Sequence, residues 1–301
     1  MRRIPGILSL LVSALSGFEY PLEHKQVTPD VHCFIGFAEA MNTTNNGNIV
    51  NSCYIDTGVS YVVIDTGPSY AYAESVYNAM QKIKPQPVAL VINTHNHDDH
   101  WLGNNFFTQK GTVVLGSDDF ARSVNLREPP RMQALISPEA YRGTVPTLPA
   151  EMISEETVRT VGNQELVIKM VKRKAHTDKD LYVYLPRSGV LFAADLVFND
   201  RLPSVRGGNV NGWIQALDAL DALKAKHVIG GHGGHSDADA ARMTRAYLTQ
   251  LRDEVRAAID DGLSIDEAMD KVTMDAFRRV GMYGAMHRGN VEATYRVLEW
   301  E

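Results

Sequence analysis

The chain has 301 residues, of which 44% are hydrophobic and 22% are charged. This length and composition predict a globular protein with one large core or two modest ones. The formal net charge of -6 comes from interspersed acidic and basic residues, without a run of lysine or arginine that would neutralise a phosphate backbone. The sequence therefore predicts no nucleic-acid partner.

The first residues have the order of a secretory signal. Two arginines precede a short apolar run, and small residues follow it. Such a run is too short to cross a bilayer as a helix, so we expect a signal peptide over residues 1–16 and no stable membrane insertion after its removal. The mature domain, residues 17–301, would then lie in the periplasm. If the segment is instead a loosely attached amphipathic one, the protein is cytoplasmic.

The two cysteines, Cys33 and Cys53, lie in two strand-like runs, residues 31–36 and 48–56. A polar segment rich in asparagine separates these runs, which predicts an antiparallel hairpin. Across such a ladder the two thiols fall close enough for a bridge. An exported protein would favour the disulfide, and two buried free thiols are the alternative.

Apolar periodicity predicts that further strands alternate with helices along the chain. The strands are expected at residues 61–67, 87–95, 112–117, 165–177, 180–189, 190–198 and 227–233. The helices are expected at residues 69–84, 100–111, 118–128, 211–225, 238–262, 264–272 and 290–301. Residues 129–153 are expected to be irregular. The pattern indicates the α/β class, with a helical extension from about residue 237.

Three histidines and two aspartates crowd into residues 95–100, directly after a predicted strand. His95 and His97 alternate, while Asp99 and His100 follow at a predicted helix start, so the four side chains can be directed at two neighbouring points. Imidazole and carboxylate together suit zinc, manganese or iron. The pattern HxHxDH after a strand predicts a metal site rather than a solvated polar turn.

One loop cannot fill two metal sites, so other segments must supply ligands. The candidates are His176, Asp195 and His232, each expected near the end of a strand. Taken singly, either histidine could be an exposed loop residue and Asp195 a cap, but their joint occurrence in this order favours ligands. His235 lies in the same glycine-rich turn as His232 and is the main competitor for that role.

From about residue 28 to His232, the chain resembles the metallo-beta-lactamase superfamily. The resemblance rests on HxHxDH, on Asp65 in VVIDTG, and on the downstream motifs AHT, AADLVF and GHGG. It implies a four-layered αββα sandwich with metals at one edge between the sheets, followed by C-terminal helices. Residues 175–205 look most like the zinc metallohydrolases associated with quinoprotein relay systems and sulfur-oxidation gene sets.

The resemblance also implies a role for each site residue. The first zinc ion would be bound by His95, His97 and His176, the second by Asp99, His100 and His232, and Asp195 would bridge the two. Asp99 would in addition be catalytic. Asp65 would order the ligand loop without touching metal.

The implied reaction is hydrolysis of a small-molecule substrate, in which a metal-bridging hydroxide attacks an ester, thioester or amide-like carbonyl. The aspartate at the bridging position resembles glyoxalase-like enzymes more than lactamases. The lysine with which many lactamases clamp the drug carboxylate is replaced by Phe198, although Asn209 matches their substrate asparagine. We therefore expect weak lactam turnover at most.

Two other readings are compatible with the same residues. A mononuclear iron sulfur dioxygenase of this superfamily would act on a persulfide and use only His95, His176 and Asp195. A non-catalytic accessory protein would retain the fold and bind metal without turnover. The sequence makes no prediction of the oligomeric state.

Overall fold

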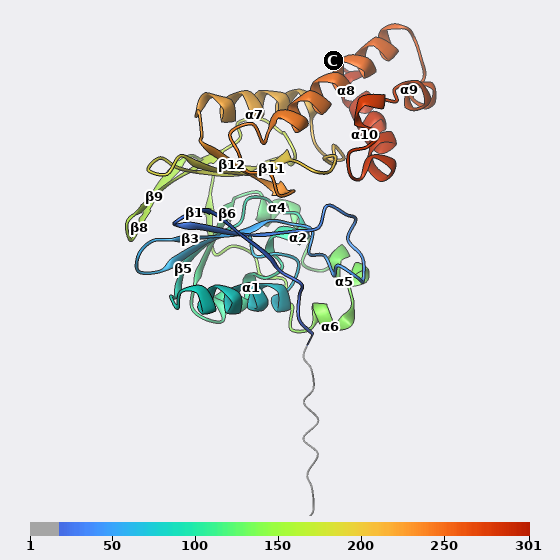
Figure 1. Ribbon diagram of the computed structural model, residues 1–301. Helices are drawn as coiled ribbons and strands as arrows, with labels where there is room; N and C mark the ends of the chain where they lie inside the picture. Colours follow the sequence, from blue (N-terminus) through green and yellow to red (C-terminus); the bar gives the residue numbers. More distant parts are fainter. Residues whose placement is uncertain (1–17) are drawn as a thin grey trace, which may run out of the picture.

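The computed structural model describes residues 18–301, so the predicted signal peptide lies outside the described residues. Two β-sheets lie face to face, and helices cover both outer faces (Figure 1). The first sheet has the strand order β1-β2-β3-β4-β5-β6-β7 and the second the order β12-β11-β10-β9-β8. This arrangement confirms the predicted αββα sandwich with C-terminal helices.

The strands account for both sheets within the described residues. They are β1 (Glu23–Thr28), β2 (Val31–Ile35), β3 (Ser52–Asp56), β4 (Tyr61–Ile64), β5 (Val88–Ile92), β6 (Val113–Ser117), β7 (Glu151–Ile153), β8 (Thr157–Val161), β9 (Gln164–Met170), β10 (Leu181–Leu185), β11 (Val190–Phe198) and β12 (His227–His232). The strand pairs from β4 to β7 are parallel, as is the pair β11–β12, and the others are antiparallel.

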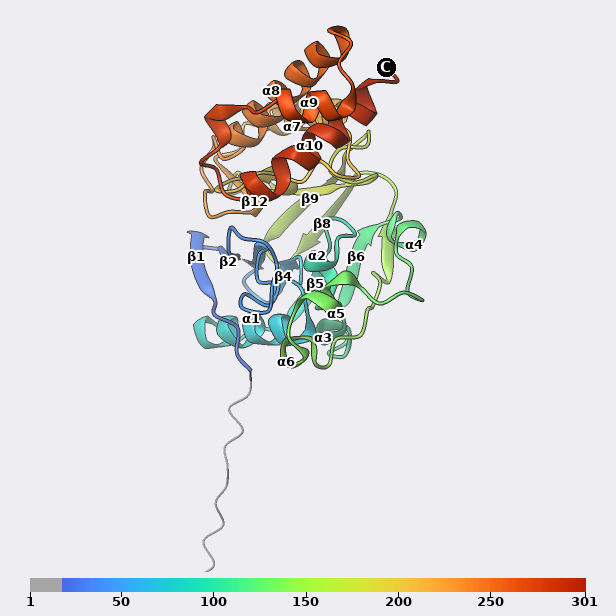
Figure 2. The same cartoon turned by 90° about the vertical axis from the view of Figure 1, so that its right-hand side faces the viewer.

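The helices divide between the two outer layers and the connecting segments. They are α1 (Tyr70–Ile83), α2 (Asp98–Trp101), α3 (Asn104–Thr108), α4 (Phe120–Ser123), α5 (Arg131–Leu135), α6 (Pro138–Tyr141), α7 (Val210–Ala222), α8 (Arg242–Asp260), α9 (Ile265–Lys271), the 3₁₀ turn η1 (Asp275–Phe277) and α10 (Tyr283–Leu298). Figure 2 shows α7 to α10 stacked on the second sheet, on the side away from the first.

Both faces of the sheets are buried, which explains their continuous apolar runs. Along β4, Val62 and Ile64 belong to the core between the sheets, whereas Tyr61 and Val63 belong to the core under α1. Successive side chains of a strand point to opposite faces, so one run of four apolar residues serves two layers. The neighbouring strand β5 is packed in the same way, with Val91 in the core under α1 and Leu90 and Ile92 in the core between the sheets.

The structure departs from the predicted elements in several places. The segment expected to be irregular, residues 129–153, contains α5, α6 and β7, and α10 begins at Tyr283 rather than at residue 290. The edge strands β1 and β8 were not predicted, because their side chains alternate between partial and full exposure and carry little apolar periodicity. The helix expected at residues 118–128 shrinks to α4. It ends at Val124, which is extended, and the Asn125 side chain then accepts a hydrogen bond from the Arg127 backbone, which favours a turn over a helix.

The predicted hairpin is present as β2 and β3, with Cys33 directly opposite Cys53 in the register. The two residues form a disulfide, the outcome that the sequence left open. Both belong to the core between the sheets. The bond joins two neighbouring strands of the first sheet.

Removing this disulfide should lower the free energy of unfolding by about 3 kcal/mol, because it closes a loop with a sequence separation of 20 residues in the unfolded chain. Urea unfolding of the oxidised wild type, the reduced wild type and the double variant Cys33→Ala/Cys53→Ala measures this difference. Unfolding midpoints that coincide in all three samples would contradict it.

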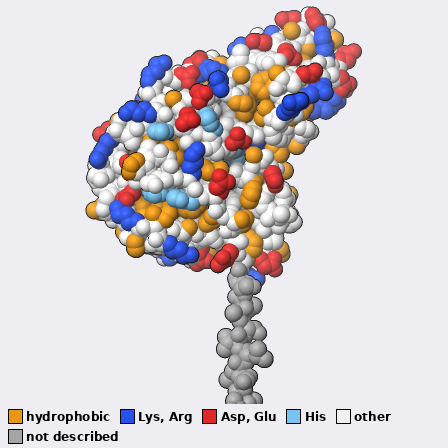
Figure 3. Space-filling view, viewed as in Figure 1, with side chains coloured by type: hydrophobic (Ala, Val, Ile, Leu, Met, Phe, Trp, Pro, Cys, Tyr) orange, Lys and Arg blue, Asp and Glu red, His pale blue; other side chains and the backbone are white. Residues whose placement is uncertain are grey.

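None of the helices in residues 18–301 is long and apolar enough to span a bilayer. On the face drawn in Figure 3, acidic and basic side chains are interspersed, as the sequence predicts, and no extended basic stripe is visible.

Candidate metal centre

The candidate ligands converge where the ends of both sheets meet. The loop after β5 carries His95 and His97 from the first sheet, and α2 begins directly after them. His176 follows β9, and His232 is the last residue of β12 in the second sheet. Segments far apart in the chain thus supply one site at the edge between the sheets.

Asp195 does not lie at a strand end as expected, but inside β11. The preceding residue, Ala194, has a φ of 48°, and the pairing of β11 with β12 shifts its register around this residue. An irregularity of this kind redirects a side chain within a strand. The irregularity at Ala194 therefore explains why the Asp195 side chain points toward the site although the rest of β11 is apolar.

The seven predicted ligands form two compact groups. The first comprises His95, His97, His176 and Asp195, and the second comprises Asp99, His100 and His232. Within each group the candidate ligand atoms all lie within 4.8 Å of one another. The structure thus brings together all seven side chains that the sequence singled out.

Asp195 contacts both groups. Its Oδ2 lies 3.1 Å from His176 Nε2 and 3.3 Å from His232 Nε2, and its Oδ1 lies 3.2 Å from His100 Nε2. One carboxylate between two sets of imidazoles is the arrangement expected of a bridging ligand.

Three buried atoms at the centre of the site make no hydrogen bond with any described residue: His95 Nε2, His100 Nε2 and Asp195 Oδ1. A buried polar atom without a partner costs about 1–3 kcal/mol. Nitrogen and carboxylate oxygen are also the donors that zinc prefers in tetrahedral or open sites. The residues present therefore fit one or two divalent cations, which would satisfy all three atoms.

The protonation states favour cation binding as well. Burial lowers the pKa of His95 well below its ordinary value, and burial together with His176 lowers the pKa of His97 to about 3. Burial alone would raise the pKa of Asp99, but His100 and other nearby cationic groups outweigh it and lower this pKa to about 2. Neutral imidazoles and an ionised carboxylate leave their lone pairs free at neutral pH.

Asp65, predicted to order this loop without touching metal, contacts two of its residues. Its carboxylate accepts hydrogen bonds from the Thr94 backbone N–H at 2.8 Å, from Thr94 Oγ1 at 2.7 Å and from His100 Nδ1 at 2.8 Å. Because His100 donates from Nδ1, its Nε2 is directed at the centre of the site. Burial would lower the pKa of His100, but the carboxylates of Asp195 and Asp65 outweigh it and raise the pKa well above its ordinary value. This position therefore favours positive charge, which a bound cation would supply in place of the proton on Nε2.

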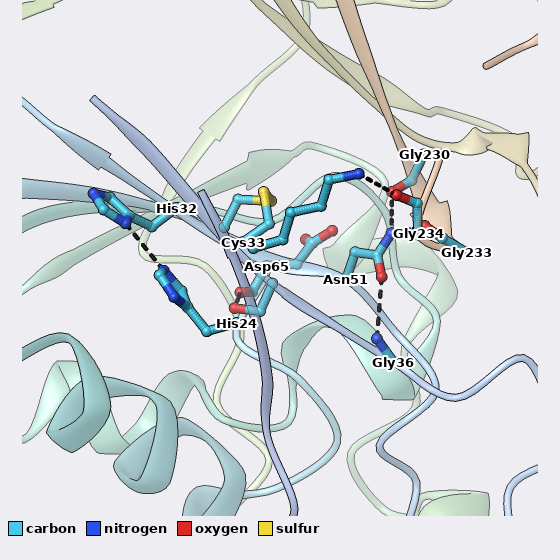
Figure 4. The surroundings of a disulfide bond; sticks show 12 residues. His24, His32, Cys33, Gly36, Asn51, Asp65, Gly230, Gly233 and Gly234 are labelled. Carbon is cyan, nitrogen blue, oxygen red and sulfur yellow. Dashed lines mark hydrogen bonds between the residues drawn. A yellow bond between two sulfur atoms is a disulfide. The ribbon is translucent and has the colours of Figure 1, made fainter. Parts of the chain in front are cut away.

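Asn51 anchors His232, and the sequence gave no sign of this role. Its side chain donates to the backbone oxygens of Gly230 and Gly233 at 2.9 and 2.8 Å (Figure 4), and His232 Nδ1 donates to the Ile49 oxygen at 2.5 Å. These bonds hold the end of β12 against the hairpin of the first sheet. An asparagine at the start of a strand-like run carries no signal for such a tertiary contact.

Gly231 is required for a related reason. A Cβ at this position would overlap Asp195 Oδ1. The glycine therefore lets β12 approach the bridging carboxylate, and its φ is not the constraint.

Arg131 contacts the loop from the other side. Its Nε donates to Asp98 Oδ1 at 2.8 Å and its Nη2 to Asp99 Oδ1 at 3.3 Å. These contacts leave Asp99 Oδ2 directed at the histidines of the second group. A cleft of about 300 Å³ opens beside Arg131 and is lined in part by His97 and Trp101, so the site is accessible from solvent there.

Two other residues behave differently from their expected roles. Asn209 caps α7, its side-chain oxygen accepting a hydrogen bond from the Gly212 backbone at 2.8 Å. Phe198, at the position of the lactamase lysine, is buried and stacks on His232 at 4.8 Å between ring centres. Both are part of the packing that supports the site.

His235 lies outside both groups. Its side chain is 47% exposed and contacts the exposed Asp239 at 3.1 Å. His235→Ala should therefore leave kcat/KM within about twofold of wild type and change the free energy of unfolding by less than about 0.5 kcal/mol. His232→Ala is the matched variant. Equal loss of activity in the two would mean that the ligand roles are exchanged.

The chain belongs to the metallo-beta-lactamase superfamily, whose family model matches residues 45–232. Among curated relatives, a linear primary-alkylsulfatase of Pseudomonas sp. is 23% identical over 261 residues, which cover 73% of this chain and 49% of the relative. The alkyl/aryl-sulfatase BDS1 of Saccharomyces cerevisiae is 23% identical over 304 residues, which cover 84% of this chain and 47% of the relative. The chain thus spans about half the length of these relatives.

Solved structures of the superfamily share the fold. The sec-alkylsulfatase Pisa1 from Pseudomonas sp. superposes with a TM-score of 0.67 at 18% identity, covering 93% of this chain and 51% of that one. A metallo-beta-lactamase from Pontibacter korlensis superposes with a TM-score of 0.59 at 24% identity, covering 76% of this chain and 99% of that one. The described fold therefore extends beyond the lactamase core.

Proposed function

We propose that this protein is a dinuclear zinc hydrolase that cleaves an ester, thioester or amide-like bond of a small molecule. The observation that carries the proposal is the pair of ligand groups joined through Asp195, with three buried atoms in need of a cation. The superfamily membership and the hydrolase names of the relatives support it.

In this proposal the residues of the chain bind the cations and orient the attacking water. His95, His97 and His176 would hold the first cation, Asp99, His100 and His232 would hold the second, and Asp195 would contribute to both, in line with the two candidate ligand groups. Two divalent cations, when bound, lower the pKa of water to near neutrality and stabilise negative charge on the substrate oxygen. Asp99, ionised and held by Arg131, is positioned to accept a hydrogen bond from the attacking water and so orient it. The substrate enters through the cleft beside His97.

A sulfate monoester is a second candidate substrate, favoured by the two curated relatives named as alkylsulfatases. In this reaction water supplies one oxygen, the ester bond breaks, and the products are an alcohol, sulfate and a proton. The reaction would take place at the same candidate metal centre. The chain covers about half of each relative, so the substrate does not follow from the name.

Metal analysis combined with a substrate panel tests the proposal. Protein loaded with zinc or with iron is analysed for metal content and assayed on ester, thioester, sulfate-ester and cephalosporin substrates, with and without oxygen. We expect two zinc ions per chain and turnover without oxygen uptake. One iron per chain with oxygen-dependent oxidation of a persulfide would replace the proposal by the dioxygenase, and metal without any turnover would replace it by the accessory protein.

We propose further that the protein is exported and loses residues 1–16. The disulfide between Cys33 and Cys53 supports this location, because disulfides persist in oxidising compartments such as the periplasm. The mass of the mature protein and its distribution between periplasmic and cytoplasmic fractions test the proposal. Full-length protein in the cytoplasm would contradict it.

A further inference from the structure

A second cavity lies between α7 and the strands β9 and β10, on the face of the second sheet that points away from the first. Figure 1 shows α7 lying along this face. The cavity has a volume of about 510 Å³, and none of the seven candidate metal ligands lines it. Small-molecule sites commonly have volumes of about 300–1,000 Å³. This groove, called the α7 groove below, is therefore large enough for a ligand that does not touch the metal centre.

The helical wall of the α7 groove is apolar and consists of short side chains. Ala216, Ala219 and Ala222 line it, at a spacing of three residues that places them on one face of the helix. These methyl groups are too short to fill the space between the helix and Val171 on the opposite wall. The lining begins at Gly212, ten residues before Ala222, so the wall is about 15 Å long. An elongated apolar wall of this kind suits a hydrocarbon chain.

The strand wall carries a tyrosine hydroxyl that has no partner in the protein. Tyr182 lines the groove and is only 6% exposed, yet its hydroxyl makes no hydrogen bond with any residue from 18 to 301. Burial, together with the Glu156 carboxylate, raises the pKa of Tyr182, so the hydroxyl stays protonated at neutral pH and can donate. The hydroxyl of a buried tyrosine usually has a hydrogen-bond partner. A ligand atom in the groove would supply the missing acceptor.

The charged residues that line the α7 groove are mostly basic. Lys169 lies directly opposite Tyr182 in the register of β9 and β10, and it pairs with Glu156 at 3.2 Å. Lys172 and Arg173 also line the groove, are exposed, and form no salt bridge with any residue from 18 to 301. Three basic side chains thus face one acidic side chain, whose charge Lys169 compensates. The surplus of positive charge favours an anionic group in the ligand.

From the volume of the α7 groove, its apolar helical wall, the unpartnered Tyr182 hydroxyl and the unpaired basic side chains, we infer that it binds a free anionic amphiphile. This ligand is a single hydrocarbon chain with one anionic head group. The chain lies along α7, and the head group accepts hydrogen bonds from Tyr182, Lys172 and Arg173. The inference goes beyond the proposed function, because binding requires neither a metal ion nor turnover.

Calorimetric titration of metal-free protein with sodium decanoate, below the concentration at which micelles form, is the first test. We expect saturable binding of one decanoate per chain. Octanoate should bind about tenfold more weakly, because it has two fewer methylene groups to bury. Decyltrimethylammonium, with a chain of the same length and the opposite charge, should bind at least tenfold more weakly than decanoate. No saturable binding of decanoate, or equal binding of the anion and the cation, would overturn the inference.

Two variants locate the binding in the α7 groove. Ala219→Trp places an indole ring in the groove from an exposed position of α7, so the fold should tolerate it, and decanoate should bind at least tenfold more weakly. Ala257→Trp, at an exposed position of α8, is the matched control and should bind as wild type does. Wild-type affinity in Ala219→Trp would overturn the inference, because the ligand would then lie elsewhere.

Charge reversal tests the role of the basic side chains. The double variant Lys172→Glu/Arg173→Glu should bind decanoate at least tenfold more weakly than wild type, and the difference should shrink at high salt. Lys82→Glu/Arg142→Glu changes two exposed basic residues outside the groove by the same amount and should stay within about twofold of wild type. Equal losses in the two double variants would reduce the effect to net charge and overturn the inference.

Tyr182→Phe separates binding from a structural role. The hydroxyl has no partner in the protein, so its removal should leave the melting temperature of the ligand-free protein unchanged and weaken decanoate binding about fivefold. A markedly lower melting temperature with unchanged affinity would assign the hydroxyl to the fold and overturn the inference. Binding to phosphatidylglycerol vesicles that Ala219→Trp abolishes, without binding of decanoate, would assign the groove to a membrane surface instead. Because the protein is metal-free throughout, these results do not depend on the hydrolase proposal.

Discussion

Asp195→Asn should lower kcat/KM by about a thousandfold or more. The change preserves the shape of the side chain but removes the negative charge that both ligand groups contact, at 3.1 Å from His176 and 3.2 Å from His100. Metal ions supply several kcal/mol of charge stabilisation in a transition state, and each 1.36 kcal/mol corresponds to a factor of ten in rate. On the proposed function, Asp99→Ala and His176→Ala should lower activity by orders of magnitude as well.

The measurements are metal content per chain, kcat/KM on the best substrate of the panel, and thermal unfolding. The exposed carboxylate of Asp218, which pairs with Arg245, provides the control variant Asp218→Asn. Two zinc ions per chain and activity within tenfold of wild type in Asp195→Asn would show that Asp195 does not bridge the cations.

Asp65→Asn should lower zinc affinity by about 10- to 100-fold without unfolding the protein, the usual effect of altering a group that orients a ligand. The asparagine oxygen can still accept the Thr94 backbone N–H, but its NH₂ group would face His100 Nδ1. The imidazole would then turn to the tautomer that carries its proton on Nε2, the atom directed at the cation. The effect would thus arise from a proton on the wrong nitrogen.

Zinc affinity in competition with a chromogenic chelator measures this effect, and the melting temperature of the metal-free protein shows whether the fold is retained. Asp56→Asn, at a more exposed carboxylate paired with Lys84, is the control. An unchanged zinc affinity in Asp65→Asn would mean that the carboxylate serves packing alone. If the metal-free Asp65→Asn variant does not fold, the main role of Asp65 is to stabilise the fold rather than to orient His100.

Much of the site could be predicted because its signals are local. His95, His97, Asp99 and His100 lie within six positions after an apolar strand, so their clustering follows from chain connectivity. Asp65 was also recognisable, because its motif VVIDTG ends a strand in the place where the superfamily has an aspartate.

Other residues could not be predicted because their roles depend on contacts between distant segments. Asn51 contacts residues about 180 positions away, and Arg131 reaches Asp98 and Asp99 from an irregular segment. His232 Nδ1 likewise donates to the backbone oxygen of Ile49, which lies 183 positions earlier in the chain. The spacing of residues along the sequence does not indicate which distant segments come into contact.

The sequence by itself determined the α/β class, because apolar runs that alternate with helical periodicity indicate strands interleaved with helices. The four-layered αββα sandwich followed from the resemblance to the superfamily. It also determined which side chains are able to bind metal, because ligand chemistry belongs to residue type. Only the tertiary structure decided that Asp195 leaves its strand at a kink toward both ligand groups, that Cys33 lies opposite Cys53, and that Asn51 holds the end of β12. The physical reason is that register, bulges and desolvation are set by packing between segments, which no local pattern encodes.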